Sequence, residues 1–301
     1  MQAAALPAVP AAVWETLSEH ACFGGAQRFH RHASAEIGLP MRFGLYLPPQ
    51  ALGHAARPVP LLVYLAGLTC TEETFAMKAG AQRLAAELGL ALLTPDTSPR
   101  GAGVAGEADA WDFGVGAGFY LDATQAPWAT HWRMESYLLR ELLPQVWAQG
   151  WAQSPGQPSR TGLFGHSMGG HGALTLALRH TGVFGSLSAI APICAPMCCP
   201  WGQKAFSGYL GDDRSGWAAH DASALMAALA AAPYPGGILI DQGGADKFLA
   251  EQLHPEDFEA ACATAGQPLT LRRHVGYDHG YYFIASVVDD HLRHHARQLG
   301  G

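Results

Sequence analysis

Short apolar runs alternate along this sequence with longer segments in which apolar residues recur at helical spacing. The run LLVYL, residues 61–65, is apolar on both faces, as is typical of a central strand. The alternation predicts a mostly parallel central sheet with helices on both faces. We predict helices at 74–88 (ended by Gly89), 134–149, 168–180 and 285–298, and strands at 42–47, 60–65, 90–94, 161–164, 187–192, 238–241 and 269–274.

One domain accounts for the length and composition. The chain has 301 residues, of which 49% are hydrophobic and 14% charged, so it can bury one large core. We expect a loosely ordered tail over residues 1–14 and a single domain over 15–301. Residues 101–127, rich in Gly and Asp with interleaved aromatics, are expected to form a surface loop region.

Charge and cysteine usage exclude several classes of function. A net charge of −7 argues against a nucleic-acid partner, and no apolar run is long enough to span a membrane. The N-terminus lacks the basic region of a secretory signal, so the six cysteines are expected to be free thiols. Cys194, Cys198 and Cys199 do not have zinc-site spacing, and we expect no metal.

The motif Gly165-His166-Ser167-Met168-Gly169 lies between a predicted strand and a predicted helix. Such a G-x-S-x-G turn lifts a serine hydroxyl clear of the sheet, and its glycines let strand and helix approach closely. The helix N-terminus behind the serine favours developing negative charge. The context predicts Ser167 as a nucleophile and an α/β-hydrolase fold.

A serine nucleophile needs a base, and the base follows the serine in this fold. His279 lies in a glycine-flanked loop after the last predicted strand, where this fold presents its chemistry. The other histidines after Ser167 are less suited: His171 and His180 in the helix after the elbow, His274 as a packed strand residue, and His291, His294 and His295 on a solvated face of the terminal helix.

The acid that orients the base is sought after the strand at 238–241. Asp241 ends that strand and could cap backbone donors, whereas Asp246 lies further out, where it could meet His279. Asp278 precedes the histidine, but neighbouring side chains rarely face each other. The residues alone favour Asp246 over Asp241 only moderately.

Two backbone N–H groups are needed to bind the oxyanion. One is expected from Met168, the residue after the nucleophile. The other is expected from the loop after LLVYL, where Leu68 is the candidate.

From about Trp14 onward the sequence resembles the S-formylglutathione hydrolase (esterase D) family. The resemblance implies a cofactor-free, cytoplasmic, commonly dimeric hydrolase that converts S-formylglutathione to formate and glutathione in formaldehyde removal, with its triad at Ser167, Asp246 and His279. Ala195 and Ala245 depart from the family pattern outside the triad. The motifs that carry the resemblance are FGG (23–25), GLTCTEETF (67–75), PDTSPRG (95–101), WDFGVGAGFYLDAT (111–124), GHSMGGHGAL (165–174), CPWGQKAFSGYLG (199–211), IDQGGADKFL (240–249) and GYDHGYYFI (276–284).

A formyl group is the smallest acyl group, so the implied activity requires a tight acyl pocket. We expect bulky residues of the aromatic-rich segments to narrow it: Trp111, Phe113, Trp201 and Phe206.

Two further residues are candidates for substrate contact. Cys70 lies two residues past Leu68, where its modification would obstruct the site, and Lys78 could meet a glutathione carboxylate.

The alternative functions for the chain are a general carboxylesterase with the same triad, an acyltransferase and a non-catalytic binding protein.

Overall fold

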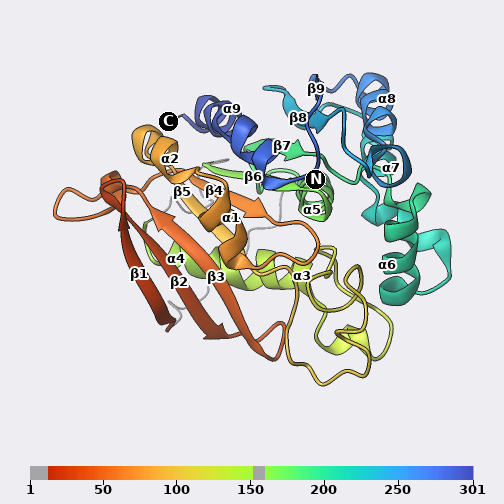
Figure 1. Cartoon of the computed structure of the whole chain (residues 1–301), viewed down its shortest axis with the longest axis horizontal. Coiled ribbons are helices and arrows are strands. Elements are labelled where there is room, and N and C mark those ends of the chain that lie inside the picture. The colour runs from red at the N-terminus through yellow and green to blue at the C-terminus, as the bar shows by residue number, and fades with distance from the viewer. Residues whose placement is uncertain (1–12, 152–159, 301) are drawn as a thin grey trace.

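Nine strands form one sheet in the order β1-β2-β3-β5-β4-β6-β7-β8-β9 (Figure 1). This computed structural model describes residues 13–151 and 160–300. All neighbours from β5 to β9 pair in parallel, whereas β1, β2, β3 and β5 pair antiparallel. The predicted α/β-hydrolase architecture with a mostly parallel sheet is confirmed. The strands are β1 (Glu15–Cys22), β2 (Gly25–Ala33), β3 (Pro40–Leu47), β4 (Leu61–Leu65), β5 (Ala91–Pro95), β6 (Thr161–His166), β7 (Ser186–Ile190), β8 (Ile238–Gly243) and β9 (Leu269–His274).

Helices cover both faces of this sheet. In Figure 1, α1, α2 and α9 lie in front of it, and α3, α4 and α5 lie behind it. One cluster of buried apolar side chains extends through the sheet and both helical layers. The helices are α1 (Glu72–Lys78), α2 (Gln82–Leu88), α3 (Met134–Ser136), α4 (Leu143–Ala148), α5 (Met168–Arg179), α6 (Pro200–Leu210), α7 (Ala222–Ala227), α8 (Pro255–Ala265) and α9 (Tyr281–Leu299).

Several predicted helices differ from the structure. The helix expected at 74–88 is broken into α1 and α2 around Gly80, which has a φ of 71°. The helix expected at 134–149 is present but includes a π-helical segment, Tyr137–Leu142, between α3 and α4. The helix expected at 285–298 begins earlier, at Tyr281.

Residues 101–127 form no helix or strand, as expected for a loop region. They do not all lie on the surface, however, because Ala117 and Phe119–Leu121 are buried in the core. The expectation of a surface loop is therefore wrong for this stretch.

The predicted tail, residues 1–14, lies outside the described residues except for its last two. Val13 is exposed, while Trp14 is half-buried, packs edge-on against Phe43 and donates a hydrogen bond to Gln145 at 3.0 Å.

The parallel strands bring four chemically important segments to one edge of the sheet. The carboxyl ends of β4, β6, β8 and β9 are followed by residues 66–70, by Ser167, by residues 244–248 and by residues 275–280. Loops after the carboxyl ends of parallel strands form the ligand crevice in open α/β sheets. The fold thus places distant parts of the sequence around one site.

Candidate active site

Ser167 occupies a sharp turn between β6 and α5. Its φ of 58° and ψ of −120° lie outside the regions that non-glycine residues prefer. The turn depends on its glycines, because a Cβ at Gly165 would overlap the backbone of Gly169, and a Cβ at Gly169 would overlap that of Leu65. The strand–turn–helix context that the motif predicted is therefore present.

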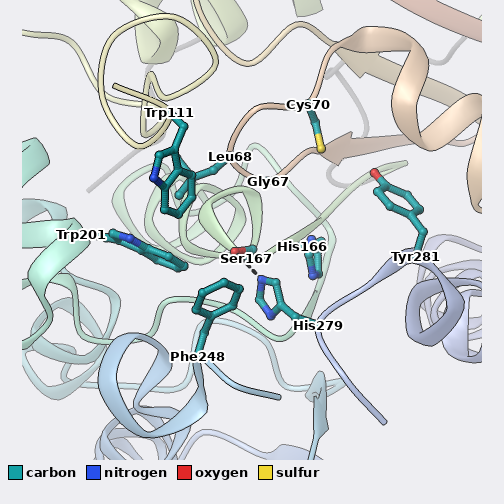
Figure 2. A pocket seen from close by; sticks show the side chains of 10 residues that line it. All are labelled: Gly67, Leu68, Cys70, Trp111, His166, Ser167, Trp201, Phe248, His279 and Tyr281. Atoms are coloured by element: carbon teal, nitrogen blue, oxygen red, sulfur yellow. Dashed lines mark hydrogen bonds between the residues drawn. The ribbon is translucent and has the colours of Figure 1, made fainter. Parts of the chain in front are cut away.

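Ser167, His279 and Asp246 form one hydrogen-bonded line (Figure 2 shows the serine and the histidine). His279 Nε2 lies 2.8 Å from Ser167 Oγ, and His279 Nδ1 lies 2.5 Å from Asp246 Oδ2. Asp246 is buried and also accepts hydrogen bonds from the backbone N–H of Phe248 (2.8 Å) and from Gln242 Nε2 (3.2 Å). This arrangement keeps the imidazole in one orientation, with Nε2 toward the serine hydroxyl.

The two other aspartates considered for the orienting acid point elsewhere. Asp241 is fully buried and forms an ion pair with Arg272, and it accepts hydrogen bonds from His274 (2.9 Å) and His291 (3.0 Å). Within residues 13–151 and 160–300 its carboxylate accepts from side chains rather than from loop backbone N–H groups, so the expected capping role is wrong. Asp278 accepts the backbone N–H of Gly280 at 2.8 Å.

The expectation of a solvated face on the terminal helix is also wrong. All three histidines are buried between α9 and the sheet: His291, His294 and His295. His291 and His295 share hydrogen bonds with Ser188, and His295 also binds Ser186. Burial lowers the pKa of His294 to about 4 and that of His295 well below its usual value. These side chains form a buried hydrogen-bonded network away from Ser167.

The proposed oxyanion donors lie beside the nucleophile. Leu68 lies in the loop after β4, and the preceding Gly67 packs against Ser167, because a Cβ on Gly67 would come within 3.2 Å of the serine Cβ. Met168 is the first residue of α5. Across residues 13–151 and 160–300, neither N–H donates to a protein acceptor. Both donors are therefore available to a ligand.

A cavity of about 120 Å³ opens over the serine (Figure 2). Trp111, Trp201 and Phe248 form one wall, with Trp111 and Trp201 edge to face at 5.5 Å between ring centroids. Cys70 and Tyr281 lie on the opposite side. Two of the four predicted aromatic residues thus line the cavity.

The other two predicted aromatics do not reach this cavity. Phe113 stacks on Tyr209 with a centroid distance of 4.5 Å, and Phe206 packs against Trp217. Phe206 is a buried core residue and Phe113 is half-buried against the core, so their expected place in the acyl pocket is wrong.

Lys78 is exposed and does not line the cavity wall. Its Nζ lies 5.7 Å from the ring centroid of Tyr281, which does line the wall. The lysine is therefore near the cavity rim.

Besides Gly67, three lining residues were not predicted as part of the site: His166, Phe248 and Tyr281. The His166 ring lies 4.4 Å from that of His279, neither of its nitrogens has a hydrogen-bond partner among the described residues, and burial lowers its pKa well below the usual value. Each of the three lies within two residues of a triad member, which is the signal that could have found them.

Residues 13–151 and 160–300 contain no group of three or more His, Cys, Asp or Glu side chains arranged to hold a metal ion. The same residues include no helix that is long and apolar enough to cross a membrane.

Known proteins resemble the chain over nearly its whole length. The Esterase family model matches residues 34–294. An S-formylglutathione hydrolase from Rattus norvegicus is 50% identical over 284 residues, which are 94% of this chain and 98% of that protein. One from Arabidopsis thaliana is 49% identical over 280 residues, covering 92% and 95% of the two chains. The solved structure of an S-formylglutathione hydrolase from Agrobacterium tumefaciens superposes with a TM-score of 0.88 at 46% identity, covering 95% of this chain and 99% of that one.

Proposed function

Because the chain belongs to the S-formylglutathione hydrolase family, within the Esterase family, we propose that it hydrolyses S-formylglutathione to formate and glutathione. The observation that carries this proposal is the hydrogen-bonded line from Asp246 through His279 to Ser167 at the base of a small cavity. Ser167 is the proposed nucleophile, His279 the base, and Asp246 the residue that orients the base.

The first chemical step forms a formyl-enzyme. Ser167 Oγ attacks the thioester carbonyl carbon while its proton passes to His279 Nε2, and Asp246 stabilises the resulting imidazolium. The tetrahedral intermediate collapses as the C–S bond breaks and glutathione leaves as a thiolate. The imidazolium then gives its proton to the thiolate sulfur within the site, and glutathione is released as the neutral thiol.

The second step regenerates the serine. Water attacks the formyl ester as His279 takes its proton, the C–O bond to Ser167 breaks, and the histidine returns the proton to Oγ. In both steps the N–H groups of Leu68 and Met168 are proposed to hold the oxyanion. Loss of one such donor costs on the order of 10²–10³-fold in rate.

The site fits a small acyl group better than a large one. A cavity of about 120 Å³ is well below the ~300–1,000 Å³ typical of pockets that enclose drug-sized ligands. Its wall at Trp201 is fixed, since that ring is buried and packs on Phe248 at 4.7 Å between centroids. A formyl group is small enough for a cavity of this volume.

Trp201→Ala is expected to widen the acyl pocket. The variant should lower kcat/KM for formyl esters several-fold and raise it for propionyl and butyryl esters, because a longer acyl chain gains room beside Phe248. Initial rates on a series of p-nitrophenyl esters measure the change. Trp217→Ala, which truncates a buried tryptophan outside the cavity, is the control for general loss of packing. An unchanged order of acyl preference in Trp201→Ala would remove Trp201 from the acyl pocket.

The chain's three lysines all lie near the cavity. Lys78 lies over Tyr281, Lys247 lies 4.9 Å from the ring centroid of Phe248, and Lys204 pairs with Asp112 next to Trp111. Among the described residues, no carboxylate forms an ion pair with Lys78 or Lys247. We infer that these two charges attract the carboxylates of the glutathione moiety to a chain that carries −7 overall.

Lys78→Gln is expected to raise KM for S-formylglutathione about three- to tenfold at low salt, while KM for uncharged p-nitrophenyl acetate stays the same, because the lysine contributes only attraction to the carboxylates. Steady-state kinetics at two ionic strengths measure the change. Arg83→Gln, which removes an exposed cation already paired with Glu87 and Asp289, is the matched control. Equal KM values in Lys78→Gln and the wild type would rule out this contact.

Alkylation of Cys70 is expected to block the active site, because the thiol lines the cavity opposite Trp111. Burial raises the pKa of the Cys70 thiol, so the modification should be slow at pH 7 and faster at pH 9. Iodoacetamide treatment with mass-verified labelling and an activity assay measures both effects. Cys70→Ser treated in parallel controls for labelling elsewhere. Full activity after complete labelling of Cys70 would contradict its place in the substrate path.

The cellular setting is proposed on thiol chemistry and family membership. All six cysteines are free thiols, which is consistent with a reducing compartment, and we propose a cytoplasmic homodimer folded as a single domain over residues 15–301. The proposed partner is a small-molecule substrate rather than a nucleic acid, because the chain carries a net negative charge. Light scattering after size-exclusion chromatography tests the dimer.

The decisive experiment compares kcat/KM for S-formylglutathione with that for p-nitrophenyl acetate, with Ser167→Ala assayed beside the wild type. A large preference for the thioester that the substitution abolishes would support the proposed function. A preference for the oxygen ester would instead make the protein a general carboxylesterase with the same triad. Undiminished turnover in the variant would mean that the nucleophile lies elsewhere.

A further inference from the structure

The loop between β4 and α1, residues 66–70, has a backbone that requires support from outside. Thr69 has a φ of 67°, a left-handed conformation that costs a non-glycine residue roughly 1–2 kcal/mol. Such strain persists only where surrounding contacts determine the conformation. Because Leu68 precedes this residue, whatever fixes Thr69 also fixes the direction of the proposed oxyanion donor.

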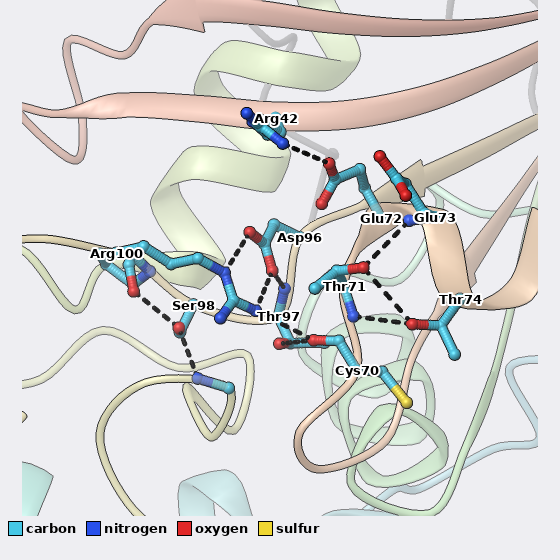
Figure 3. Close-up of polar contacts among 12 residues, drawn as sticks. Arg42, Cys70, Thr71, Glu72, Glu73, Thr74, Asp96, Thr97, Ser98 and Arg100 are labelled. Atoms are coloured by element: carbon cyan, nitrogen blue, oxygen red, sulfur yellow. Dashed lines mark hydrogen bonds and ion pairs between the residues drawn. The ribbon is translucent and has the colours of Figure 1, made fainter. Parts of the chain in front are cut away.

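The support comes from the segment after β5, residues 95–101 (Figure 3). The carbonyl of Cys70 accepts two hydrogen bonds from it, one from Thr97 Oγ1 at 2.6 Å and one from Arg100 Nη2 at 3.1 Å. On the other side of the loop, the N–H of Thr69 donates to the carbonyl of Gly116 at 2.9 Å, and the N–H of Gly116 donates to Ser98 Oγ at 2.8 Å. The strained turn is therefore held from both sides.

Arg100 is itself fixed before it reaches the loop. Its guanidinium donates two hydrogen bonds to the Asp96 carboxylate, at 2.7 and 2.8 Å, and Asp96 also accepts the backbone N–H of Thr97 at 2.7 Å. Asp96 is buried just after β5, and its hydrogen bonds to the guanidinium, together with its charge, raise the pKa of Arg100. A bidentate pair of this kind restricts the guanidinium to one plane, so its remaining Nη2 hydrogen points at the Cys70 carbonyl.

We propose that Thr97 and Arg100 are positioning residues that fix the Cys70 carbonyl and thereby orient the Leu68 N–H toward the oxyanion. This inference rests on the proposed role of Leu68 as a donor. The motif at 95–101 would thus support the active site indirectly, since none of its side chains lines the cavity over Ser167. Neither residue touches the reacting atoms, so both act through the loop.

Loss of these contacts should affect the transition state more than the bound substrate. A donor that shifts by a fraction of an ångström stabilises the developing charge less, while the aromatic walls that hold the acyl group stay in place. The expected signature is a lower kcat with little change in KM. A general loss of folding would lower the melting temperature and the concentration of active enzyme instead.

Thr97→Val tests the proposal, because it keeps the shape of a fully buried side chain and removes only the hydroxyl. We expect kcat for S-formylglutathione to fall on the order of 10- to 100-fold, with KM and the inhibition constant of glutathione within about twofold of wild type. Thr97→Ser, which restores the hydroxyl, should recover kcat to within about threefold.

Thr94→Val is the matched control. Thr94 is another buried threonine, near the end of β5, but its hydroxyl donates to the carbonyl of Glu72 in α1. Wild-type kcat in Thr94→Val beside the expected loss in Thr97→Val would support the proposal. A kcat for Thr97→Val within threefold of wild type, or an equal loss in both variants, would overturn it.

Arg100→Lys decides the matter if Thr97→Val does not fold. The lysine keeps a positive charge beside Asp96 but cannot bind both the carboxylate and the Cys70 carbonyl with a planar fork. A tenfold lower kcat at unchanged KM would support the proposal, and an unchanged kcat would overturn it. Ser167→Ala assayed in the same series separates the two levels: activity retained in that variant would refute the proposed function itself, and activity lost in it leaves only the positioning role in question.

Discussion

Ser167→Ala is expected to lower kcat for S-formylglutathione by about 10⁴-fold or more and to leave KM within a few-fold. The methyl group cannot form the formyl ester, but the cavity walls and the Leu68 N–H remain. His279 would then face an empty position at the end of its 2.8 Å hydrogen bond. The residual rate would come from the oxyanion donors and from binding alone.

Substitutions of His279 and Asp246 should also lower kcat strongly. His279→Gln should match the serine variant, and the double variant should be no slower than either one, because the two residues act as a unit. Asp246→Asn keeps the shape of the carboxylate but presents an amide N–H to Nδ1. That change favours the tautomer in which Nε2 carries the proton, so that Nε2 cannot accept the proton of Ser167. We therefore expect kcat to fall roughly 10³–10⁴-fold.

Single-turnover assays and mass spectrometry measure these effects together. A quenched reaction of the wild type with p-nitrophenyl acetate should leave an acetyl group on the peptide that contains Ser167. Ser223→Ala, which removes a half-buried hydroxyl bound to the Cys194 carbonyl, is the matched control and should remain fully active. An acetyl group found on a different peptide would show that Ser167 is not the nucleophile.

The hydrogen-bonded line of Ser167, His279 and Asp246, our proposed triad, was predictable from the sequence because each member follows a strand that the hydrophobic pattern reveals. The residues favoured Asp246 over Asp241 only moderately, since Asp241 lies near the end of β8 and Asp246 comes shortly after it. The structure separates them, because the partners of Asp241 come from β9 and α9, at Arg272 and His291. Such partners are close in space but distant in sequence, so no local pattern identifies them.

The face of α9 was misjudged for a related reason. Histidine counts as polar in a hydrophobic pattern, so His291 and His295 suggested a solvated surface. Both side chains instead pack against the sheet, because Ser186 and Ser188 on β7 supply hydrogen-bond partners. The edge strand β1 and its neighbour β2 were not predicted, and β1 is mostly exposed and carries polar side chains on both faces. Tertiary partners, rather than local propensity, determine these elements.

These buried histidines lead to a second large expected effect, on stability at acid pH. In the folded protein burial lowers the pKa of seven of the described histidines, to about 3 for His171, to about 4 for His30, His220 and His294, well below the usual value for His166 and His295, and below it for His32. In the unfolded chain each titrates near 6.5. The unfolded state therefore binds more protons below about pH 6.5, and stability falls as the pH falls.

Some carboxyl groups act in the opposite direction. Burial raises the pKa of Glu72 and of Asp221, so the folded state binds protons there before the unfolded state does. Their contribution is limited to two groups and to the pH range just above their ordinary values near 4. Between pH 7 and 5 the histidines should dominate, and the free energy of unfolding should decrease steadily.

His171→Gln isolates one of these histidines. His171 is buried behind the elbow on α5, and its contribution between pH 6.5 and 5 is about 2 kcal/mol. Urea unfolding at pH 7, 6 and 5 should therefore show a shallower loss of stability in His171→Gln than in the wild type, even if the variant is less stable at pH 7. His54→Gln, at an exposed position, should leave the slope unchanged. Equal slopes in all three proteins would mean that His171 titrates alike in the folded and unfolded states, which its burial argues against.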